Sequence, residues 1–315
     1  MESNFVTSSA LLLLAFIFFV FKINIRNRSL PLPPRPFQWP IIGNLNALCT
    51  NKPVFRWIHR LMQEMNTEIL CLRFFNTYVI AVSSDDLATE FLKRQDIIFS
   101  SRPVCLAAEI TTSGYLSAAL GPMGDQWKKM RRVLVSELLS HNRHKWLLDK
   151  RNEEADNLVR YVYNQACSNL TGVVVNVRVA AQHYCGNVIR KLIFGKRFFG
   201  TGMEDGGPGA EEEEHVDALF TILAYLYSFC VSDYVGFLRR RLDLDGHEKI
   251  IRKAVESVRK YQDPLIDERA QQWKKGTKTE REDLLDVMLS LEKEGTPVLS
   301  IDEVKAQVVV SGVSF

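Results

Sequence analysis

Residues 124–139, GDQWKKMRRVLVSELL, are the most informative stretch of this 315-residue chain. Trp127 and Arg131 are four residues apart, so both side chains project from one face of the predicted helix. An indole N–H beside a guanidinium suits a buried carboxylate, to which arginine can donate two parallel hydrogen bonds. On an amphipathic helix the same pair is more commonly a stacked surface contact. The spacing alone leaves both interpretations open.

Most of the globular region is predicted to be helical, because apolar side chains recur every three or four positions. Stretches with this pattern are residues 56–65, 86–95, 125–139, 145–165, 180–194, 213–229 and a long run from 246. Two β-rich runs, residues 67–75 and 78–83, predict a small early hairpin. Pro264 predicts a bend or break in the last long run. Ser300 and Glu303 predict a capping box that opens another helix.

Two segments of the globular region lack helical periodicity. Residues 103–121 mix Thr, Ser, Gly and Ala with a few large apolar side chains, which is typical of a loop that covers a ligand and equally of a plain surface loop. Residues 203–214, MEDGGPGAEEEE, predict a flexible connection whose acidic run is solvated and begins the next helix.

The amino terminus contains an unbroken apolar run, ALLLLAFIFFVF, at residues 10–21. Glu2 precedes this run, and Lys22, Arg26 and Arg28 follow it. A cleaved signal peptide has the opposite charge order, so the run predicts a single membrane anchor with the rest of the chain in the cytosol. A buried helix of the globular domain is the alternative.

Prolines are concentrated directly after this anchor, in the segment PLPPRPFQWP at residues 31–40. They prevent a helix and favour a stiff, extended spacer, although a ligand for an SH3-type module has a similar composition. The predicted organisation is a membrane anchor with a basic flank at residues 1–30, a proline-rich hinge at 31–52 and a globular domain at 53–315.

Charge and cysteine usage exclude two other classes of function. Lys and Arg number 40 against 37 Asp and Glu, a net charge of +3 that gives no support to a nucleic-acid binder. The six cysteines form no C-x-x-C pair, and the six histidines form no H-E-x-x-H motif, so no metal site is predicted. Cys185, inside a helical pattern, is predicted to be a buried structural thiol.

The order of these features resembles that of plant microsomal cytochromes P450. An anchor and a proline hinge come first, then a helix, a hairpin, the loop Ser101-Arg102-Pro103 and the Trp127 helix. The likeness extends from residue 31 to about 305, although the family usually has glycine where Arg35 stands. The segments NKPVFRWIHRLMQEMNTEI and NVRVAAQHYCGNVIRKLIFGKRFFG are similar to the branch that N-hydroxylates amino acids to aldoximes, such as phenylalanine and tyrosine N-monooxygenases.

This resemblance implies a mainly α fold, the N-terminal portion of the cytochrome P450 fold with its small early β-hairpin. It also implies roles for particular side chains. Trp127 and Arg131 would hold a haem propionate. A basic surface for NADPH–cytochrome P450 reductase would comprise Lys128, Lys129 and Arg132, for which a plain solvated face is the alternative. The remaining substrate-pocket wall would include Ile110, Thr112, Tyr115 and Tyr227.

The function implied by the resemblance is that of a haem-thiolate monooxygenase of the endoplasmic reticulum membrane, single-pass, which converts an amino acid to an aldoxime for defence compounds. The family presents its iron-binding cysteine in an F-x-x-G-x-R-x-C-x-G loop, and none of the six cysteines has those neighbours. We therefore assign no catalytic residue or metal ligand, and expect the chain to be a truncated front part that is inactive. The alternative is a haem-free helical membrane protein that interacts with intact P450s or their reductase.

Overall fold

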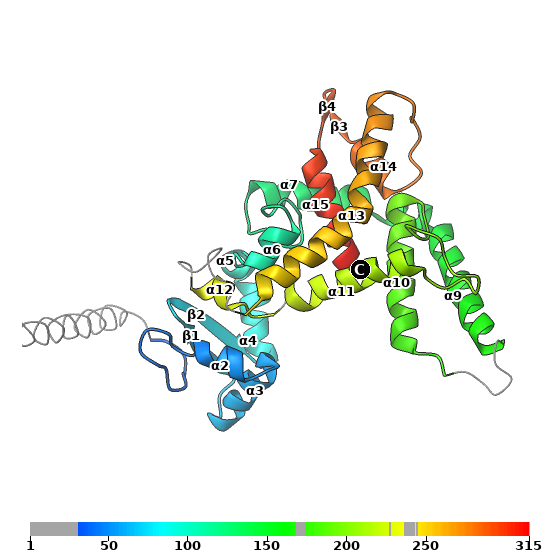
Figure 1. Cartoon of the computed structure of the whole chain (residues 1–315). Coiled ribbons are helices and arrows are strands. Elements are labelled where there is room, and N and C mark those ends of the chain that lie inside the picture. The colour runs from blue at the N-terminus through cyan, green and yellow to red at the C-terminus, as the bar shows by residue number, and fades with distance from the viewer. Residues whose placement is uncertain (1–30, 168–173, 227, 236–242, 244, 315) are drawn as a thin grey trace, which may run out of the picture. The chain divides into compact units, whose positions relative to one another are not determined.

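The computed structural model describes residues 31–167, 174–226, 228–235, 243 and 245–314 (Figure 1). The chain divides into two compact units, one of residues 1–100 and 229–244 and the other of residues 101–228 and 245–315. Within the described residues no helix has the length and apolar character needed to cross a bilayer. The predicted anchor, residues 1–30, lies outside the described part of the chain.

The first unit is built on a two-stranded antiparallel sheet, as the two β-rich runs predicted. Strand β1 (Ile69–Phe74) pairs with β2 (Thr77–Val82), with Ile69 opposite Val82 and Phe74 opposite Thr77. Leu70, Leu72 and Phe74 are fully buried in a core with residues of the surrounding helices. The helices that contribute to this core are α2 (Leu45–Thr50), α3 (Val54–Glu64) and α12 (Val231–Tyr234). The unit also contains α4 (Asp85–Thr89), the π-helix η1 (Glu90–Arg94) and α5 (Asp96–Phe99).

The proline-rich segment is joined to this sheet by backbone contacts. Residues 31–38 contain neither helix nor strand, in agreement with the prediction. Gly43 has a φ of +66°, and a Cβ there would lie 2.2 Å from the carbonyl oxygen of Arg73, so only glycine allows the close approach. The neighbouring Asn44 is buried, and its side chain donates to the carbonyl of Phe37 and accepts from the amide of Arg73. The end of the hinge is therefore fixed to β1.

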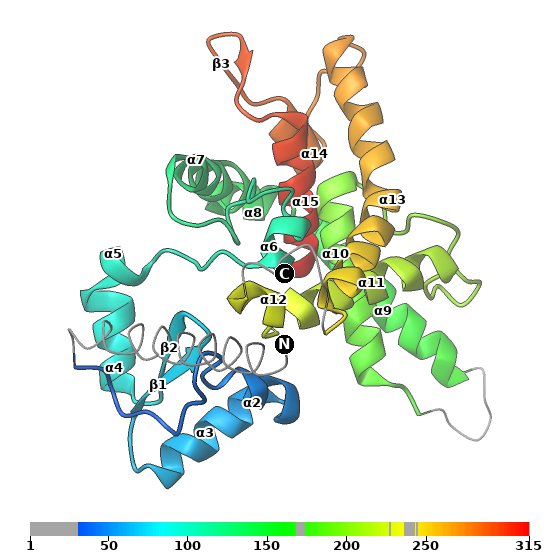
Figure 2. The same cartoon turned by 60° about the vertical axis from the view of Figure 1, so that its left-hand side comes forward.

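The regular secondary structure described in the second unit is helical apart from one small hairpin. Its strands, β3 (Glu292–Lys293) and β4 (Thr296–Pro297), have two residues each. Its helices are α6 (Leu106–Thr111), α7 (Asp125–Val133), the π-helix η2 (Leu134–Leu138), α8 (His141–Trp146), α9 (Leu148–Cys167), α10 (Val177–Phe194), α11 (Ala210–Leu226), α13 (His247–Lys274), α14 (Leu284–Leu289) and α15 (Ile301–Ser314). Figure 2 shows α15 beside α14 and α13, and it also packs on α6, α10 and α11.

Helix α15 connects the two apolar cores of this unit. Val304 and Val308 belong to one core, with Phe194 and Leu285, whereas Val309 belongs to the other, with residues of α11 and α13. These three valines are 0% exposed. Because the buried side chains point in several directions around the axis, α15 is an interior helix rather than an amphipathic surface helix.

Four sequence predictions differ from the structure in the second unit. Residues 106–111 form helix α6, which was predicted to be part of a loop, because Leu106, Ala107 and Ala108 are buried against neighbouring helices. Helix α11 begins at Ala210 rather than 213. Pro264 lies inside the continuous helix α13, in which Val258 and Ile266 are buried on either side of it. Their burial offsets the cost of about 3 kcal/mol that a proline imposes within a helix. Cys185 is exposed, not buried.

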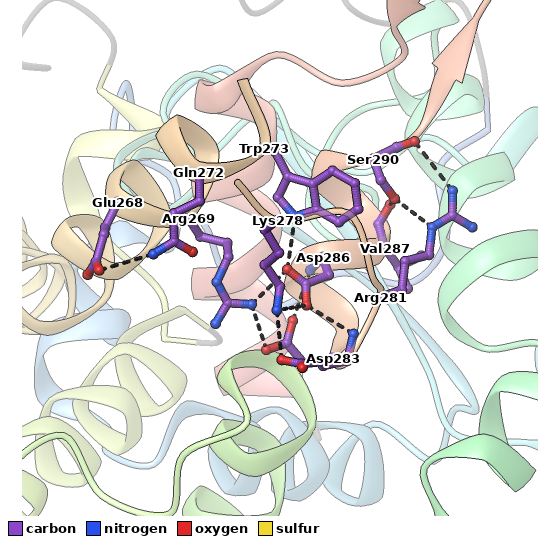
Figure 3. A network of polar contacts seen from close by, with 11 residues as sticks. Glu268, Arg269, Gln272, Trp273, Lys278, Arg281, Asp283, Asp286, Val287 and Ser290 are labelled. Carbon is purple, nitrogen blue, oxygen red and sulfur yellow. Dashed lines mark hydrogen bonds and ion pairs between the residues drawn. The ribbon is translucent and has the colours of Figure 1, made fainter. Parts of the chain in front are cut away.

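A buried carboxylate joins α13 to α14 (Figure 3). Asp286 is 0% exposed and accepts from Arg269 Nη1 at 2.7 Å, from Trp273 Nε1 at 2.9 Å and from the Glu282 amide at 3.0 Å. Asp283 caps α14 by accepting from the Asp286 amide and also accepts from Arg269. Burial alone would raise the pKa of Asp286, but the donors from Trp273 and Arg269 outweigh it, so its pKa is lowered.

We expect Asp286→Asn to destabilise the chain by about 3–5 kcal/mol, because it removes one charge of a buried ion pair and replaces an acceptor with an NH₂ group. The free energy of unfolding, measured by urea titration with circular dichroism, tests this. Glu268→Gln is the matched control, since Glu268 is exposed on the same helix as Arg269, and should change stability by less than about 0.5 kcal/mol. Equal effects of the two substitutions would contradict a buried polar junction.

Candidate functional site

Helix α7 carries the tryptophan and the arginine from which the sequence analysis began. It starts after Gly124, and η2 continues it to Leu138, so the predicted helix over residues 125–139 is confirmed. Met130 and Val133 are buried and fix one side of α7 against the core. Since successive residues turn by about 100° around a helix, the charged residues of KKMRR necessarily face different environments.

Trp127 and Arg131 lie together, as their spacing predicted. The guanidinium carbon of Arg131 is 5.0 Å from the centre of the Trp127 ring, a cation–π contact. Trp127 is half-buried and Arg131 is exposed. Among the described residues Arg131 makes no ion pair, so its N–H groups are available to an external carboxylate. The structure is thus compatible with both open interpretations, a stacked surface contact and an anion site.

The three other basic residues of α7 differ in their contacts. Lys129 Nζ donates to both carboxylate oxygens of Glu303, each at 2.7 Å, and is not directed to an external partner. Lys128 is exposed and forms a loose 3.8 Å pair with Asp125. Arg132 is also exposed. Of the three residues predicted as a reductase-docking surface, Lys128 and Arg132 therefore present their charge to solvent.

Of the predicted pocket residues, Ile110, Thr112 and Tyr115 belong to the part of the chain that the structure describes. Ile110 packs against the core that contains Ile222 and Val258. Thr112 is 0% exposed, and its hydroxyl donates to the carbonyl of Ala108 at 2.7 Å. Tyr227 lies outside the described residues.

Tyr115 belongs to an unusual turn after α6. It has a φ of 69° and follows Ser113 and Gly114, which also have positive φ. Non-glycine residues rarely adopt this conformation, so contacts around the turn must maintain it. The Thr112 hydroxyl accepts from the Tyr115 amide at 2.7 Å, and Arg259 donates to the Ser113 hydroxyl at 2.6 Å. Thr112 thus acts here in holding the turn.

A cavity of about 250 Å³ lies elsewhere in the second unit, between η2, α8, α9, α10 and α14. Its lining is mostly apolar and includes Leu138, Ile189 and Leu192, with the Cys185 thiol among them. Ile110, Thr112 and Tyr115, the described members of the predicted pocket, do not line this cavity. Sequence reasoning did not find it, because its walls come from helices that are far apart along the chain.

A buried charged cluster is the other feature that the sequence did not predict. Arg190 on α10 forms an ion pair with Glu212 on α11, and their side chains are 2% and 1% exposed. Arg190 also donates to the Asn187 side chain, and its guanidinium lies 4.9 Å from the centre of the Phe199 ring. Burial raises the pKa of Glu212 to about 7 and lowers that of Arg190 to about 10. Glu212 is therefore not solvated with the rest of its acidic run.

Comparison with known proteins identifies a family for this chain. The family model of cytochrome P450 matches residues 33–311. A tryptophan N-monooxygenase from Prunus mume is 53% identical over 311 residues, which cover 96% of this chain and 58% of that protein. A tyrosine N-monooxygenase from Sorghum bicolor is 53% identical over 279 residues, 88% of this chain and 50% of that protein. A phenylalanine N-monooxygenase from Arabidopsis thaliana is 52% identical over 286 residues, 89% and 54% respectively. The chain spans about half the length of the curated relatives it matches.

The residues of this chain fit one part of a haem site. Arg131 is an exposed guanidinium without an acidic partner in the described structure, and it lies beside the Trp127 indole, so the pair suits a propionate carboxylate. For the iron, none of the six cysteines has the F-x-x-G-x-R-x-C-x-G neighbours, and the described ones lie at separate places in the fold. We assign no axial ligand and derive no reaction step through the iron.

The contacts of α7 predict that two neighbouring cations contribute very differently to stability. Arg131→Gln should change the free energy of unfolding by less than about 0.5 kcal/mol, because the guanidinium is exposed. Lys129→Met should cost about 1–3 kcal/mol, because it leaves the Glu303 carboxylate buried without its cation. Urea unfolding of both variants gives the comparison. A larger loss for Arg131→Gln would show that Arg131 is structural.

His215 predicts a pH dependence of stability. Burial, with a smaller contribution from the Arg190 charge, lowers its pKa from 6.5 to about 3. The unfolded chain therefore binds the proton first, and stability falls as pH drops below 6.5, by up to about 1.4 kcal/mol per pH unit. Glu212 acts in the opposite direction between pH 4.5 and about 7, because its folded-state pKa is raised.

His215→Gln separates these two titrations, since glutamine keeps a polar group beside Gln262 and leaves Glu212 in place. Unfolding free energies of both proteins between pH 4 and 8 should diverge, with the wild type losing more stability toward acid. Parallel curves would mean that His215 has the same pKa in the folded and the unfolded chain, so that its pKa is not lowered by burial.

Proposed function

Because this chain belongs to the cytochrome P450 family, we propose that its function is the N-hydroxylation of an amino acid to an aldoxime, with a haem held in part by Trp127 and Arg131. The observation that carries this proposal is the similarity of 45–54% identity to proteins named as N-monooxygenases of tryptophan, isoleucine, valine, tyrosine and phenylalanine. The chain's own residues support it through the unpaired guanidinium beside an indole on α7.

In this proposal each residue of α7 has a separate task. Arg131 donates paired N–H groups to a haem propionate, and the Trp127 N–H adds a further donor on the same face. A bound haem would supply oxygen activation, with two electrons from NADPH through cytochrome P450 reductase. Lys128 and Arg132 are exposed and offer positive charge to an acidic docking surface of that reductase. Lys129 pairs with Glu303 and offers less free charge to such a surface than its two neighbours do.

We also place the globular part on the cytosolic side of the endoplasmic reticulum membrane, held by one anchor helix. The support is the apolar run at residues 10–21, with Lys22, Arg26 and Arg28 directly after it. Positive charge on the carboxyl side of an anchor favours a cytosolic position for the chain beyond the anchor. An amino-acid substrate suits this placement, because amino acids are soluble in the cytosol.

A second candidate function is a haem-free protein that interacts with intact P450s or with the reductase. The observation that favours it is the stacking of the Arg131 guanidinium on the Trp127 ring, a contact that needs no haem. Here Lys128 and Arg132 would bind a partner in the same way, but Trp127 and Arg131 would form only a surface contact.

A chimera distinguishes the two candidates. Residues 1–311 joined to the remaining part of the Prunus mume tryptophan N-monooxygenase, expressed with a reductase, should give a thiolate-type Soret band with carbon monoxide after reduction. It should also form an aldoxime from at least one of the five amino acids. Arg131→Gln in the chimera should lower haem content, whereas Glu268→Gln should not.

The 315-residue chain is expressed in parallel and should give no thiolate-type band. If it does, one of its six cysteines binds the iron and our assignment of no axial ligand is wrong. A chimera that binds haem normally and forms no aldoxime from any of the five amino acids would refute N-hydroxylation.

A further inference from the structure

The carboxylate of Glu303 closes the capping box of α15. Its Oε2 accepts from the Ser300 amide at 2.8 Å, and the Ser300 hydroxyl accepts from the Glu303 amide at 3.2 Å. These two contacts satisfy free amides at the start of the helix. In a capping box at the protein surface the glutamate needs no further partner, because water solvates its charge. Glu303 is only 5% exposed, so its charge needs other partners.

The same carboxylate binds two side chains of α7. Oε1 accepts from Gln126 Nε2 at 2.8 Å, and Lys129 Nζ donates to both oxygens at 2.7 Å. Burial alone would raise the pKa of Glu303, but the donors from Lys129, the Ser300 amide and Gln126 outweigh it, so its pKa is lowered. Glu303 is therefore charged at neutral pH, and it connects α7 to the interior helix of the unit.

Because Lys129 lies on one side of α7, its contact with Glu303 influences which way the other side of the helix faces. Trp127 and Arg131 are each two residues from Lys129, so they lie on roughly the opposite side of the helix. Holding Lys129 toward α15 keeps the indole and the guanidinium turned away from it. Apolar contacts of Met130 and Val133 restrain α7 as well, but an ion pair with two short hydrogen bonds restrains its rotation more narrowly.

We propose that Glu303 is a positioning residue for the anion site of α7: through Lys129 and Gln126 it fixes the rotation of the helix at which Trp127 and Arg131 together bind a haem carboxylate. This inference rests on the proposed function, since it takes a propionate as the ligand. It adds that the site depends on a carboxylate that never touches the haem. Of the cations in KKMRR, Lys129 pairs with Glu303, whereas Arg131 faces away from that acid and makes no ion pair among the described residues.

The probes are ferric protoporphyrin IX and its dimethyl ester, which differ only in whether the propionates are charged. Dissociation constants of both are measured with the detergent-solubilised 315-residue chain from Soret absorbance and tryptophan quenching. The wild type should bind the free acid about tenfold more tightly than the ester, the effect of one charge-assisted contact. Arg131→Gln should reduce this ratio to near one.

Three variants test Glu303 itself. Glu303→Gln keeps a capping-box side chain and removes the charge, and Lys129→Met removes the cation. Both should reduce the acid-to-ester ratio several-fold. Asp302→Asn is the matched control, because Asp302 is an exposed acid in the same turn of α15, and it should keep the wild-type ratio. Circular dichroism confirms that each variant is folded.

The reversed pair, Lys129→Glu with Glu303→Lys, supplies a measurement that a capping role cannot explain. It loses the capping box but restores an ion pair between α7 and α15, so the ratio should recover at least in part. It also replaces Glu303→Gln as the decisive variant if that protein does not fold.

The outcomes distinguish propionate binding by α7 from the positioning role of Glu303. A wild-type ratio near one would refute propionate binding and with it this part of the proposed function. A tenfold wild-type ratio that persists in both Glu303→Gln and Lys129→Met would refute the positioning role alone.

Discussion

The link between Glu303 and Lys129 joins the interior helix α15 to the helix that carries the candidate site. Helix α15 is surrounded by apolar side chains over most of its length, and its first turn is where it makes this polar contact with α7. Helix α7 is short and is held otherwise by Met130 and Val133 in the core. The orientation of Trp127 and Arg131 thus depends on a carboxylate whose position is set by α15.

Three buried carboxylates of the second unit show what determines their ionisation. Glu303 and Asp286 each receive several hydrogen bonds, and the pKa of each is lowered despite burial. Glu212 is paired with Arg190 and accepts from the Phe199 amide, yet burial dominates and its pKa rises to about 7. Asp283 is also buried and accepts from the Asp286 amide and from Arg269, yet burial still raises its pKa, so the balance between burial and pairing differs from site to site. Helix contacts through Glu303 and Asp286 are therefore the ones that persist across neutral pH.

Sequence patterns predicted those elements whose determinants are local. The hairpin around Phe74, the helix around Trp127 and the capping box of Ser300 and Glu303 each depend on residues close together in the chain, and all three are confirmed. The burial of Glu212 and the exposure of Cys185 were not predictable in this way. Both depend on which side of a helix meets a neighbour far away in sequence.

The candidate site also combines a locally determined feature with contacts that are distant in sequence, within the five residues KKMRR. The sequence KKMRR predicts a basic helix face, and nothing in it distinguishes one cation from another. The structure separates them, because Lys129 meets a buried acid 174 positions later while Arg131 stacks on Trp127. A cation that is not paired with an acid of its own chain can bind an acidic group of a ligand at little free-energy cost, because no existing ion pair must first be broken. Arg131 therefore remains available to an anionic ligand because it lies on the other side of α7 from Glu303 and makes no ion pair among the described residues.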